Sequence, residues 1–227
     1  MRYLMAIIIT IGVLATSFAQ KQDFTKSADN DPEATKILDK VSAKYEAYKS
    51  IEALFTLKIA IPEEPVDQQK GKMIQEGEKY NVDLQEMTMI SDGVDNFWVH
   101  NKRNEECQLN DIPDPEDDDM LAPQEFYSFY KSGKYVYALT NALVEDRKPV
   151  LQIEFKPLDG ESEYSKIRMT IEKKTNIVKR VRVFAKDGSN YTLTIDKITP
   201  NKKFTAADFT FDKKKHPNVH VENLKMD

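Results

Sequence analysis

The sequence predicts an α+β fold, in which helices cover one side of an antiparallel sheet. Most segments after residue 50 alternate apolar and polar residues, the period of two that a sheet with one buried face requires. One segment near the N-terminus instead has apolar residues at helical spacing. The chain has no strand–helix–strand rhythm, so we expect no parallel sheet of the crossover type.

Residues 1–19 are predicted to be a secretory signal peptide. Arg2 gives a positive start, and residues 4–14 form an apolar run that is too short to span a bilayer comfortably. Ser17 and Ala19 place small residues at −3 and −1 of a cleavage site. The alternative is an anchor that is not cleaved. No Cys follows the run, so we expect a protein outside the cytoplasm without a lipid anchor of its own.

Composition and charge restrict the function. The formal net charge of −5 does not favour binding to nucleic acid or to an anionic membrane surface. Cys107 is the only cysteine, so no internal disulfide can form. We interpret it as a small strand residue; the alternative is a reactive thiol. Residues 20–30 are polar and aperiodic, which predicts a flexible segment, and residues 31–227 are long enough for one domain with a real core.

A helix is predicted from Asp31 to about Ser50. Asp31 is a favourable N-cap, Pro32 suits a first turn, and Glu33 lies at the positive end of the helix dipole. One apolar stripe follows this helix and comprises Ile37, Leu38, Val41, Tyr45 and Tyr48.

Strands are predicted after this helix. Residues 53–61 alternate and end at a proline-containing turn. Residues 71–99 are predicted to be three short antiparallel strands, with turns at Gly77 and at Ser91–Gly93. Further strands are predicted at 104–110, 150–156, 166–171, 177–184 and 191–195, with short pieces at 209–211 and 219–221.

An acidic loop and an aromatic segment interrupt the strands. Residues 111–119 carry five Asp and one Glu, but two prolines and the lack of an Asp-x-Asp-x-Asp-Gly frame favour a solvated loop over a calcium site. Residues 121–130 are predicted to be a short aromatic helix. This helix either packs on the core or covers a surface that is sometimes exposed.

The sequence does not predict an enzyme, a metal site or a cofactor. It has no phosphate-binding Gly-rich loop, Cys-x-x-Cys pair, His-Glu-x-x-His helix or Gly-x-Ser-x-Gly elbow. Ser128 and Lys131 have the Ser-x-x-Lys spacing of serine acylases without the companion motifs. His216 and His220 are separated by Pro217 in an extended segment, which disfavours joint metal binding. A one-sided sheet with more apolar face than two helices can cover instead predicts an apolar ligand, with residues 121–130 as a lid.

Taken in order, these segments resemble the LolA family of periplasmic lipoprotein carriers, particularly the forms of Bacteroidetes-type bacteria. The resemblance runs from about Asp31 to Leu224. The segments that carry it are Ala43–Ser50, Ala53–Leu57, Gly71–Lys72, Gly77–Tyr80, Ser91–Gly93, Ser165–Ile167, Lys186–Thr192, Phe209–Phe211 and Pro217–Val221.

The resemblance implies an open, incomplete antiparallel β-barrel of about 10–11 strands, with a helical lid over its concave apolar face. It also implies a monomer in the periplasm with acylated lipoproteins as cargo. An ABC-type exporter of the inner membrane would be the donor, and an outer-membrane acceptor or the membrane itself the recipient. The sequence departs from the family pattern at Gly77-Glu78-Lys79, where better-known members have the Arg-Pro whose Arg bonds to the lid. Phe97 stands at the place of a family Trp, and Trp98 follows on the opposite face.

Under this carrier hypothesis, alternate residues of several strands line the acyl cavity and aromatic residues form the lid. The expected lining is Phe55, Leu57, Ile59, Tyr80, Val82, Leu84, Phe97, Val99, Leu151, Ile153, Phe155, Ile167 and Met169, and the expected lid is Leu121, Phe126, Phe129 and Tyr130. The alternative is a sensor or scaffold of the same fold, which binds lipids or unfolded envelope proteins without transferring them. An enzyme with Ser128 as nucleophile is the third hypothesis.

Overall fold

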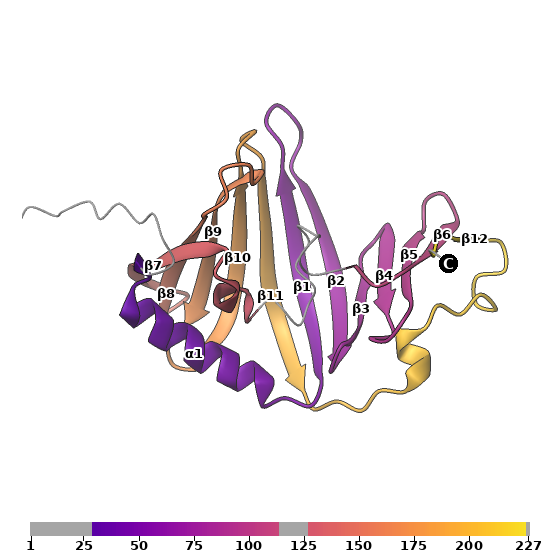
Figure 1. Ribbon diagram of the computed structural model, residues 1–227, viewed down its shortest axis with the longest axis horizontal. Helices are drawn as coiled ribbons and strands as arrows, with labels where there is room; N and C mark the ends of the chain where they lie inside the picture. The colour runs from indigo at the N-terminus through magenta and orange to yellow at the C-terminus, as the bar shows by residue number, and fades with distance from the viewer. Residues whose placement is uncertain (1–28, 114–126, 226–227) are drawn as a thin grey trace, which may run out of the picture.

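A computed structural model of the chain describes residues 29–113 and 127–225, which form one 12-stranded sheet, one α-helix and two short 3-10 helices (Figure 1). The sheet is antiparallel except for one parallel pair at an edge. It does not close into a barrel, because its two edge strands lie at opposite ends of the strand order. The predicted α+β class with an open, barrel-like antiparallel sheet is therefore confirmed.

The elements follow one another in a simple order along the chain. The helices are α1 (Pro32–Glu46), η2 (Phe129–Ser132) and η3 (Ala206–Phe209). The strands are β1 (Ile51–Ala60), β2 (Asp67–Glu76), β3 (Lys79–Asp83), β4 (Met87–Ser91), β5 (Phe97–Asn101), β6 (Glu106–Asn110), β7 (Tyr135–Glu145), β8 (Lys148–Pro157), β9 (Tyr164–Glu172), β10 (Ile177–Ala185), β11 (Asn190–Pro200) and β12 (His220–Asn223).

The sheet consists of two wings that meet at one long-range pair. Its order is β12-β6-β5-β4-β3-β2-β1-β11-β10-β9-β8-β7. Strands β1 to β6 form one antiparallel run and β7 to β11 form the other, each from sequential neighbours. The pair β1–β11 joins the two runs in the middle of the sheet. This pairing could not be read from local sequence patterns.

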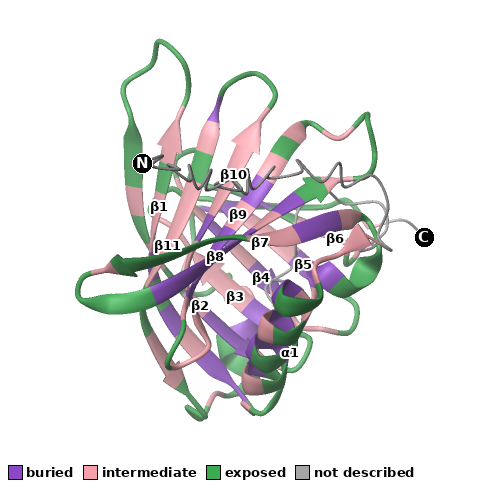
Figure 2. Cartoon of the chain, turned by 90° about the vertical axis from the view of Figure 1, so that its left-hand side faces the viewer, coloured by how far each residue is buried: buried purple, intermediate pink, exposed green. Residues whose placement is uncertain are grey.

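Helix α1 covers one face of the β7–β10 wing (Figures 1 and 2). Its start is the predicted one, because Asp31 Oδ1 accepts a hydrogen bond of 2.8 Å from the backbone N–H of Glu33. The helix buries Leu38, Val41 and Tyr45 against the sheet. We call the side of the sheet that α1 covers the concave face, and the opposite side the outer face.

The residues before α1 occupy the edge of the sheet at β7. Asn30 Oδ1 accepts a hydrogen bond of 3.0 Å from the N–H of Tyr137, and Asp31 Oδ2 accepts one of 3.0 Å from the N–H of Leu139. The N–H of Asp31 donates in turn to the carbonyl of Tyr137 at 3.1 Å. Backbone groups of the edge strand β7 that would otherwise remain unpaired therefore form hydrogen bonds with residues of the same chain.

Two strand predictions are wrong in detail. Residues 67–101 form the four strands β2 to β5, where the alternation predicted three over 71–99. Residues 209–211 are not a strand, since Phe209 ends the 3-10 helix η3. Asp208 Oδ2 accepts hydrogen bonds from Thr205 N–H and Oγ1 at 2.7 and 2.8 Å, the reciprocal cap that starts a helix.

The short helix η3 lies on the outer face of the sheet, opposite α1, where the sequence predicted no helix. Asn81 of β3 donates from Nδ2 to the carbonyl of Asp208 at 3.0 Å. Beyond η3, the ring of Phe211 lies 5.1 Å from that of His100, and His216 lies 4.9 Å from it. The chain then adds β12 parallel to β6. A C-terminal segment therefore covers the outer face of the β2–β6 wing.

Cys107 lies in this outer layer, on β6, and is buried. Burial raises the pKa of its thiol to about 11, which keeps the group protonated at neutral pH. The interpretation of Cys107 as a small strand residue therefore agrees with its surroundings.

A concave apolar face with a partly covering helix

Strand register places the predicted lining residues on the concave face. Leu57 of β1 pairs with Leu193 of β11, and Val82 of β3 pairs with Met73 of β2 and Met89 of β4. Met89 pairs in turn with Val99 of β5. Directly paired residues share a face of a sheet. The apolar row that crosses from β11 to β5 comprises Ile198, Ala53, Met73, Val82, Met89 and Val99, while Leu57 lies opposite Gln69 of β2.

The predicted residues on β8 and β9 belong to the packed core. Ile153 pairs with Met169, Phe155 pairs with Ile167, and all four are buried in the cluster beneath α1. Leu151 is buried as well, opposite Ile171. In this wing, helix α1 packs directly on these residues.

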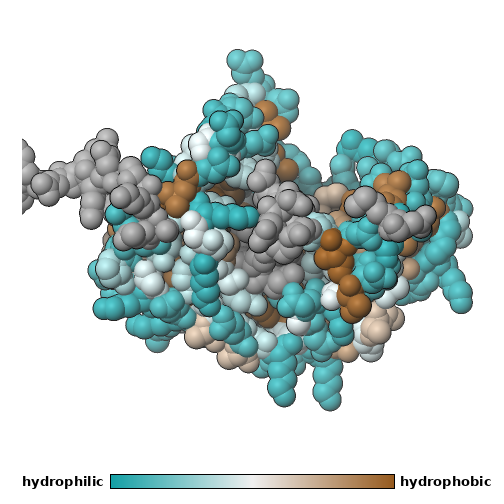
Figure 3. Space-filling model, viewed as in Figure 1, coloured by the Kyte–Doolittle hydropathy of each residue, from teal (hydrophilic) through white to brown (hydrophobic). Residues whose placement is uncertain are grey.

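The predicted residues on β1 to β5 are less completely covered. Phe55, Tyr80 and Phe97 are buried. The half-buried residues are Leu57, Ile59, Val82, Leu84 and Val99. Tyr191, which pairs with Ile59 across β1–β11, is 36% exposed. Figure 3 shows hydrophobic residues reaching the surface on the face viewed in Figure 1. The concave face thus carries partly exposed apolar side chains beside a fully packed half.

Of the four predicted lid residues, Phe129 and Tyr130 are described, and Leu121 and Phe126 lie outside the described residues. Phe129 is buried with its ring 4.7 Å from that of Phe155. Tyr130 is buried too, and its hydroxyl donates to Asp39 Oδ1 of α1 at 2.7 Å. Burial and the Asp39 carboxylate raise the pKa of Tyr130. The described part of the predicted aromatic helix is the short 3-10 helix η2, packed on the core.

A second polar contact fixes η2 to α1. Lys131 Nζ donates to Ser42 Oγ at 2.9 Å and forms an ion pair with Glu46 at 3.1 Å. Hydrogen bonds from Ser42 and Lys131 lower the pKa of Glu46. The Lys131 amine therefore contacts α1 through Ser42 and Glu46.

Tyr45 connects α1 to the sheet. Its hydroxyl accepts a hydrogen bond of 3.3 Å from the N–H of Val178, where the β9–β10 register shifts. Its ring stacks on Tyr127 at 5.2 Å. Burial raises the pKa of this hydroxyl far above its usual range. Sequence periodicity placed Tyr45 on the apolar stripe, but its role as partner of a strand amide has no sequence signal.

Lys79, at the family's Arg-Pro position, is turned away from the concave face. It pairs with Glu76 at 3.7 Å, and its amine lies 5.7 Å from the ring of Phe209 on the outer face. Phe97 lies on the concave face and Trp98 on the other, as predicted from their order in β5.

Within residues 29–113 and 127–225, no group of three or more His, Cys, Asp and Glu side chains could hold a metal ion. The acidic loop is described only to residue 113, so the calcium alternative lies mainly outside the described residues. Among the described residues, no helix has the length and apolarity needed to cross a membrane.

Several solved structures are similar to this chain. An uncharacterized conserved protein from Thermus thermophilus aligns with a TM-score of 0.54 at 10% identity, covering 84% of this chain and 99% of the other. A LolA superfamily protein from Nitrosomonas europaea aligns at 0.42 and 12% identity over 78% and 97%. MucB aligns at 0.42 and 9% identity over 80% and 64%. At these identities only the first likeness supports the fold, and none supports a function.

No curated protein sequence matches the chain. The family model described as "Outer membrane lipoprotein carrier protein LolA" matches residues 46–212, which include β1 to β11 and both 3-10 helices. A match over this much of the chain means that the protein belongs to the LolA family.

Proposed function

We propose that the protein carries acylated lipoproteins through the periplasm and holds their acyl chains on the concave face. The observation that supports this proposal most strongly is the partial cover of that face. Helix α1 and η2 pack on the β7–β10 wing, while Leu57, Ile59 and Val82 on the other side remain half-buried. The family description names the same class of cargo.

The energetics suit a carrier of acyl chains. Each buried methylene group contributes about 0.8 kcal/mol, so two chains give on the order of 20 kcal/mol of gross stabilisation. Ordering the cargo and opening the face reduce this value substantially. A face that is already partly covered limits the net affinity, which a carrier needs in order to release its load.

The polar contacts between η2 and α1 support a cover that can open. Tyr130–Asp39 and Lys131–Glu46 are individual hydrogen bonds and ion pairs, and the Lys131 and Glu46 side chains are both about half exposed. An exposed ion pair contributes at most about 1 kcal/mol. We propose an inner-membrane ABC-type exporter as donor and an outer-membrane acceptor or the membrane as recipient.

Charged substitutions on the two faces of β1 test the carrier role. Leu57→Glu places a carboxylate on the concave face, whereas Leu54→Glu places the same group on the outer face, where Leu54 is 42% exposed. Both positions are exposed enough for a folded product. Ile153→Glu is unsuitable, because Ile153 is 0% exposed and an unpaired charge there would unfold the domain.

The measurement is mass spectrometry of acylated proteins that co-purify with the protein from its native envelope. We expect lipoproteins with the wild type and with Leu54→Glu, and a strong loss with Leu57→Glu. Equal recovery of acylated proteins with both variants would contradict the binding of acyl chains on the concave face. Bound lipid without lipoprotein, together with normal lipoprotein delivery in a deletion strain, would favour the sensor hypothesis.

A further inference from the structure

A polar pocket lies on the outer face of the sheet, opposite the proposed acyl-binding face. It has a volume of about 290 Å³ and is formed by side chains of β1, β8, β9, β10 and β11. Four of its lining residues are cations: Lys58, Arg168, Arg180 and Arg182. Among the other lining residues, only Ala60 is apolar. This composition differs sharply from that of the concave face.

Strand register explains how the cations come together. Arg182 pairs directly with Arg168 of β9 and with Thr192 of β11, and Thr192 pairs with Lys58 of β1. These residues form one row across four neighbouring strands. Arg180 lies two residues from Arg182 on the same face. Like charges placed directly opposite on a sheet destabilise it, so this arrangement calls for a compensating group.

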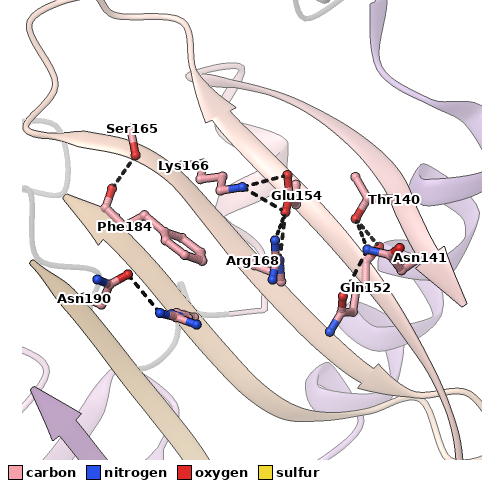
Figure 4. A network of polar contacts seen from close by, with 10 residues as sticks. Thr140, Asn141, Gln152, Glu154, Ser165, Lys166, Arg168, Phe184 and Asn190 are labelled. Carbon is pink, nitrogen blue, oxygen red and sulfur yellow. Dashed lines mark hydrogen bonds and ion pairs between the residues drawn. The ribbon is translucent and has the colours of Figure 1, made fainter. Parts of the chain in front are cut away.

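Carboxylates compensate only part of this charge. Glu154 accepts from Arg168 Nε at 2.8 Å and from Lys166 at 3.2 Å, as Figure 4 shows. Burial raises the pKa of Glu154, but these hydrogen bonds outweigh it and lower the pKa overall. Arg180 pairs with Glu145 at 2.8 Å. In the part of the chain that the structure describes, no carboxylate forms an ion pair with Lys58 or Arg182.

Arg182 makes two contacts, but its hydrogen-bonding capacity is incompletely satisfied. Its guanidinium carbon lies 4.6 Å from the centre of the Phe184 ring, and one terminal nitrogen donates to Asn190 Oδ1 at 3.2 Å. Its Nε is buried, with no hydrogen-bond partner among the described residues. A buried donor without a partner is costly. The terminal N–H groups of the same guanidinium that do not bond to Asn190 are the ones that an acceptor in the pocket would meet.

We infer that this pocket binds a phosphate group, with Arg182, Arg168 and Lys58 as its cationic contacts. The planar fork of an arginine presents two parallel donors that match phosphate oxygens. Arg182 has no carboxylate partner among the described residues, whereas Arg168 uses Nε and one terminal nitrogen on Glu154 and offers the pocket its other terminal nitrogen. Neutral donors among the lining residues, Asn190 and Thr192, can complete the hydrogen bonding. The phosphate could belong to a lipid headgroup or to a free phosphorylated molecule, and the volume is near the lower limit of small-molecule sites.

This site is independent of the acyl-binding proposal, since it lies on the opposite face and uses none of the same residues. Either proposal can fail without the other. Substitutions in the pocket are therefore expected to leave the recovery of acylated proteins unchanged.

The test compares three purified proteins: the wild type, Arg182→Gln and the matched variant Lys40→Gln, which removes one positive charge from the exposed side of α1. Titration calorimetry at constant ionic strength uses inorganic phosphate in one arm and acetate in another. A third arm measures co-sedimentation with vesicles of phosphatidylglycerol mixed with phosphatidylcholine, against phosphatidylcholine alone. Lys58→Gln is the second pocket variant, because Lys58 is exposed and can be changed without disturbing the fold.

We expect Arg182→Gln to weaken phosphate or vesicle binding about tenfold, the effect of losing one charge-assisted hydrogen bond. We expect Lys40→Gln to bind phosphate or vesicles as the wild type does. Binding of inorganic phosphate would identify a free phosphorylated ligand, and binding of anionic vesicles alone a lipid headgroup. The proposal is overturned by no binding in any arm, by acetate binding as well as phosphate, or by equal effects of the pocket and Lys40 variants. Should Arg182→Gln fail to fold, the same criteria apply to Lys58→Gln.

Discussion

The ring of Phe55 lies in the space where a side chain at position 71 would begin. Gly71 pairs directly with Phe55 across β1–β2, and a Cβ at residue 71 would stand 2.5 Å from Cε2 of that ring and 3.0 Å from Leu84 Cδ2. Real Cβ atoms do not approach other atoms so closely. The missing side chain of Gly71 therefore lets the Phe55 ring lie against β2 on the concave face.

Gly71→Ala is expected to destabilise the protein by about 1–3 kcal/mol, the usual cost of overpacking. Urea unfolding measures the change. Gly160→Ala is the control, since a Cβ there would meet no atom within 4 Å. The explanation predicts that Phe55→Ala removes most of the Gly71→Ala effect in a double-mutant cycle. Additive effects of the two substitutions would show that the ring is not the obstacle.

Tyr45→Phe is expected to cost about 1–2 kcal/mol of stability. The substitution keeps the ring stacked on Tyr127 but leaves the N–H of Val178 without its buried acceptor. Tyr48→Phe is a matched control, because no side-chain hydrogen bond of Tyr48 is seen among the described residues and its ring is only half-buried. Chemical denaturation of both variants provides the comparison. A loss of stability no larger for Tyr45→Phe than for Tyr48→Phe would contradict the role of Tyr45 as acceptor for the Val178 amide.

Tyr130→Phe is expected to loosen η2 from α1, because it removes a hydrogen bond worth about 1 kcal/mol to the closed state. The affinity for a fluorescent acyl ligand should then rise roughly fivefold. Tyr137→Phe is the control, because its hydroxyl contacts Thr35 of α1 at 3.2 Å and the substitution keeps the contact of its ring with Tyr130. Both substitutions remove one hydrogen bond to α1. An affinity change shared by both would point to general loosening of α1.

Acid is expected to destabilise the outer layer through His100. Burial, followed by the neighbouring His216 and Lys102, lowers the pKa of His100 below its ordinary value of 6.5. Between the two values the unfolded chain binds a proton that the folded chain does not, so the free energy of unfolding falls as the pH drops through and below 6.5. His100→Gln should flatten this dependence between pH 8 and 5.

Thermal or urea unfolding at several pH values measures this effect. His220→Gln, which removes an exposed histidine from β12, is the control variant. Carboxylates with lowered pKa values also make the protein less stable in acid, but at lower pH. The contribution of His100 is therefore the difference in pH dependence between the two variants. Identical slopes for His100→Gln and the wild type would remove His100 as the cause.

Sequence patterns predicted local structure well and long-range arrangement poorly. Asp31 and Pro32 identified the start of α1, and period-two alternation identified most strands of the second wing. The pairing of β1 with β11, and hence the row that joins Lys58 to Arg182, depends on contacts that no local pattern encodes. No local pattern placed the residues of the pocket next to one another.

The outer layer was missed for a different reason. Phe209 and Phe211 looked like a short strand, because two aromatic residues flank a threonine. The signal that decides the structure is the pair Thr205 and Asp208, whose spacing is that of a helix cap and which could have been read from the sequence. Alternation placed Leu57 and Val82 on the concave face, as the strand register does. Which half of the concave face α1 covers depends on tertiary packing.

The β1–β11 pair also bears on when this protein can finish folding. Thr56 and Asp196, which bond across it, are 140 positions apart in the chain. Closing so long a loop is slow, and it cannot happen before almost the whole polypeptide has been synthesised. Each wing can pair locally earlier, but the two halves stay separate until the last long strand emerges. Such late completion would suit the export predicted from residues 1–19, in which a chain is threaded through a membrane before it folds.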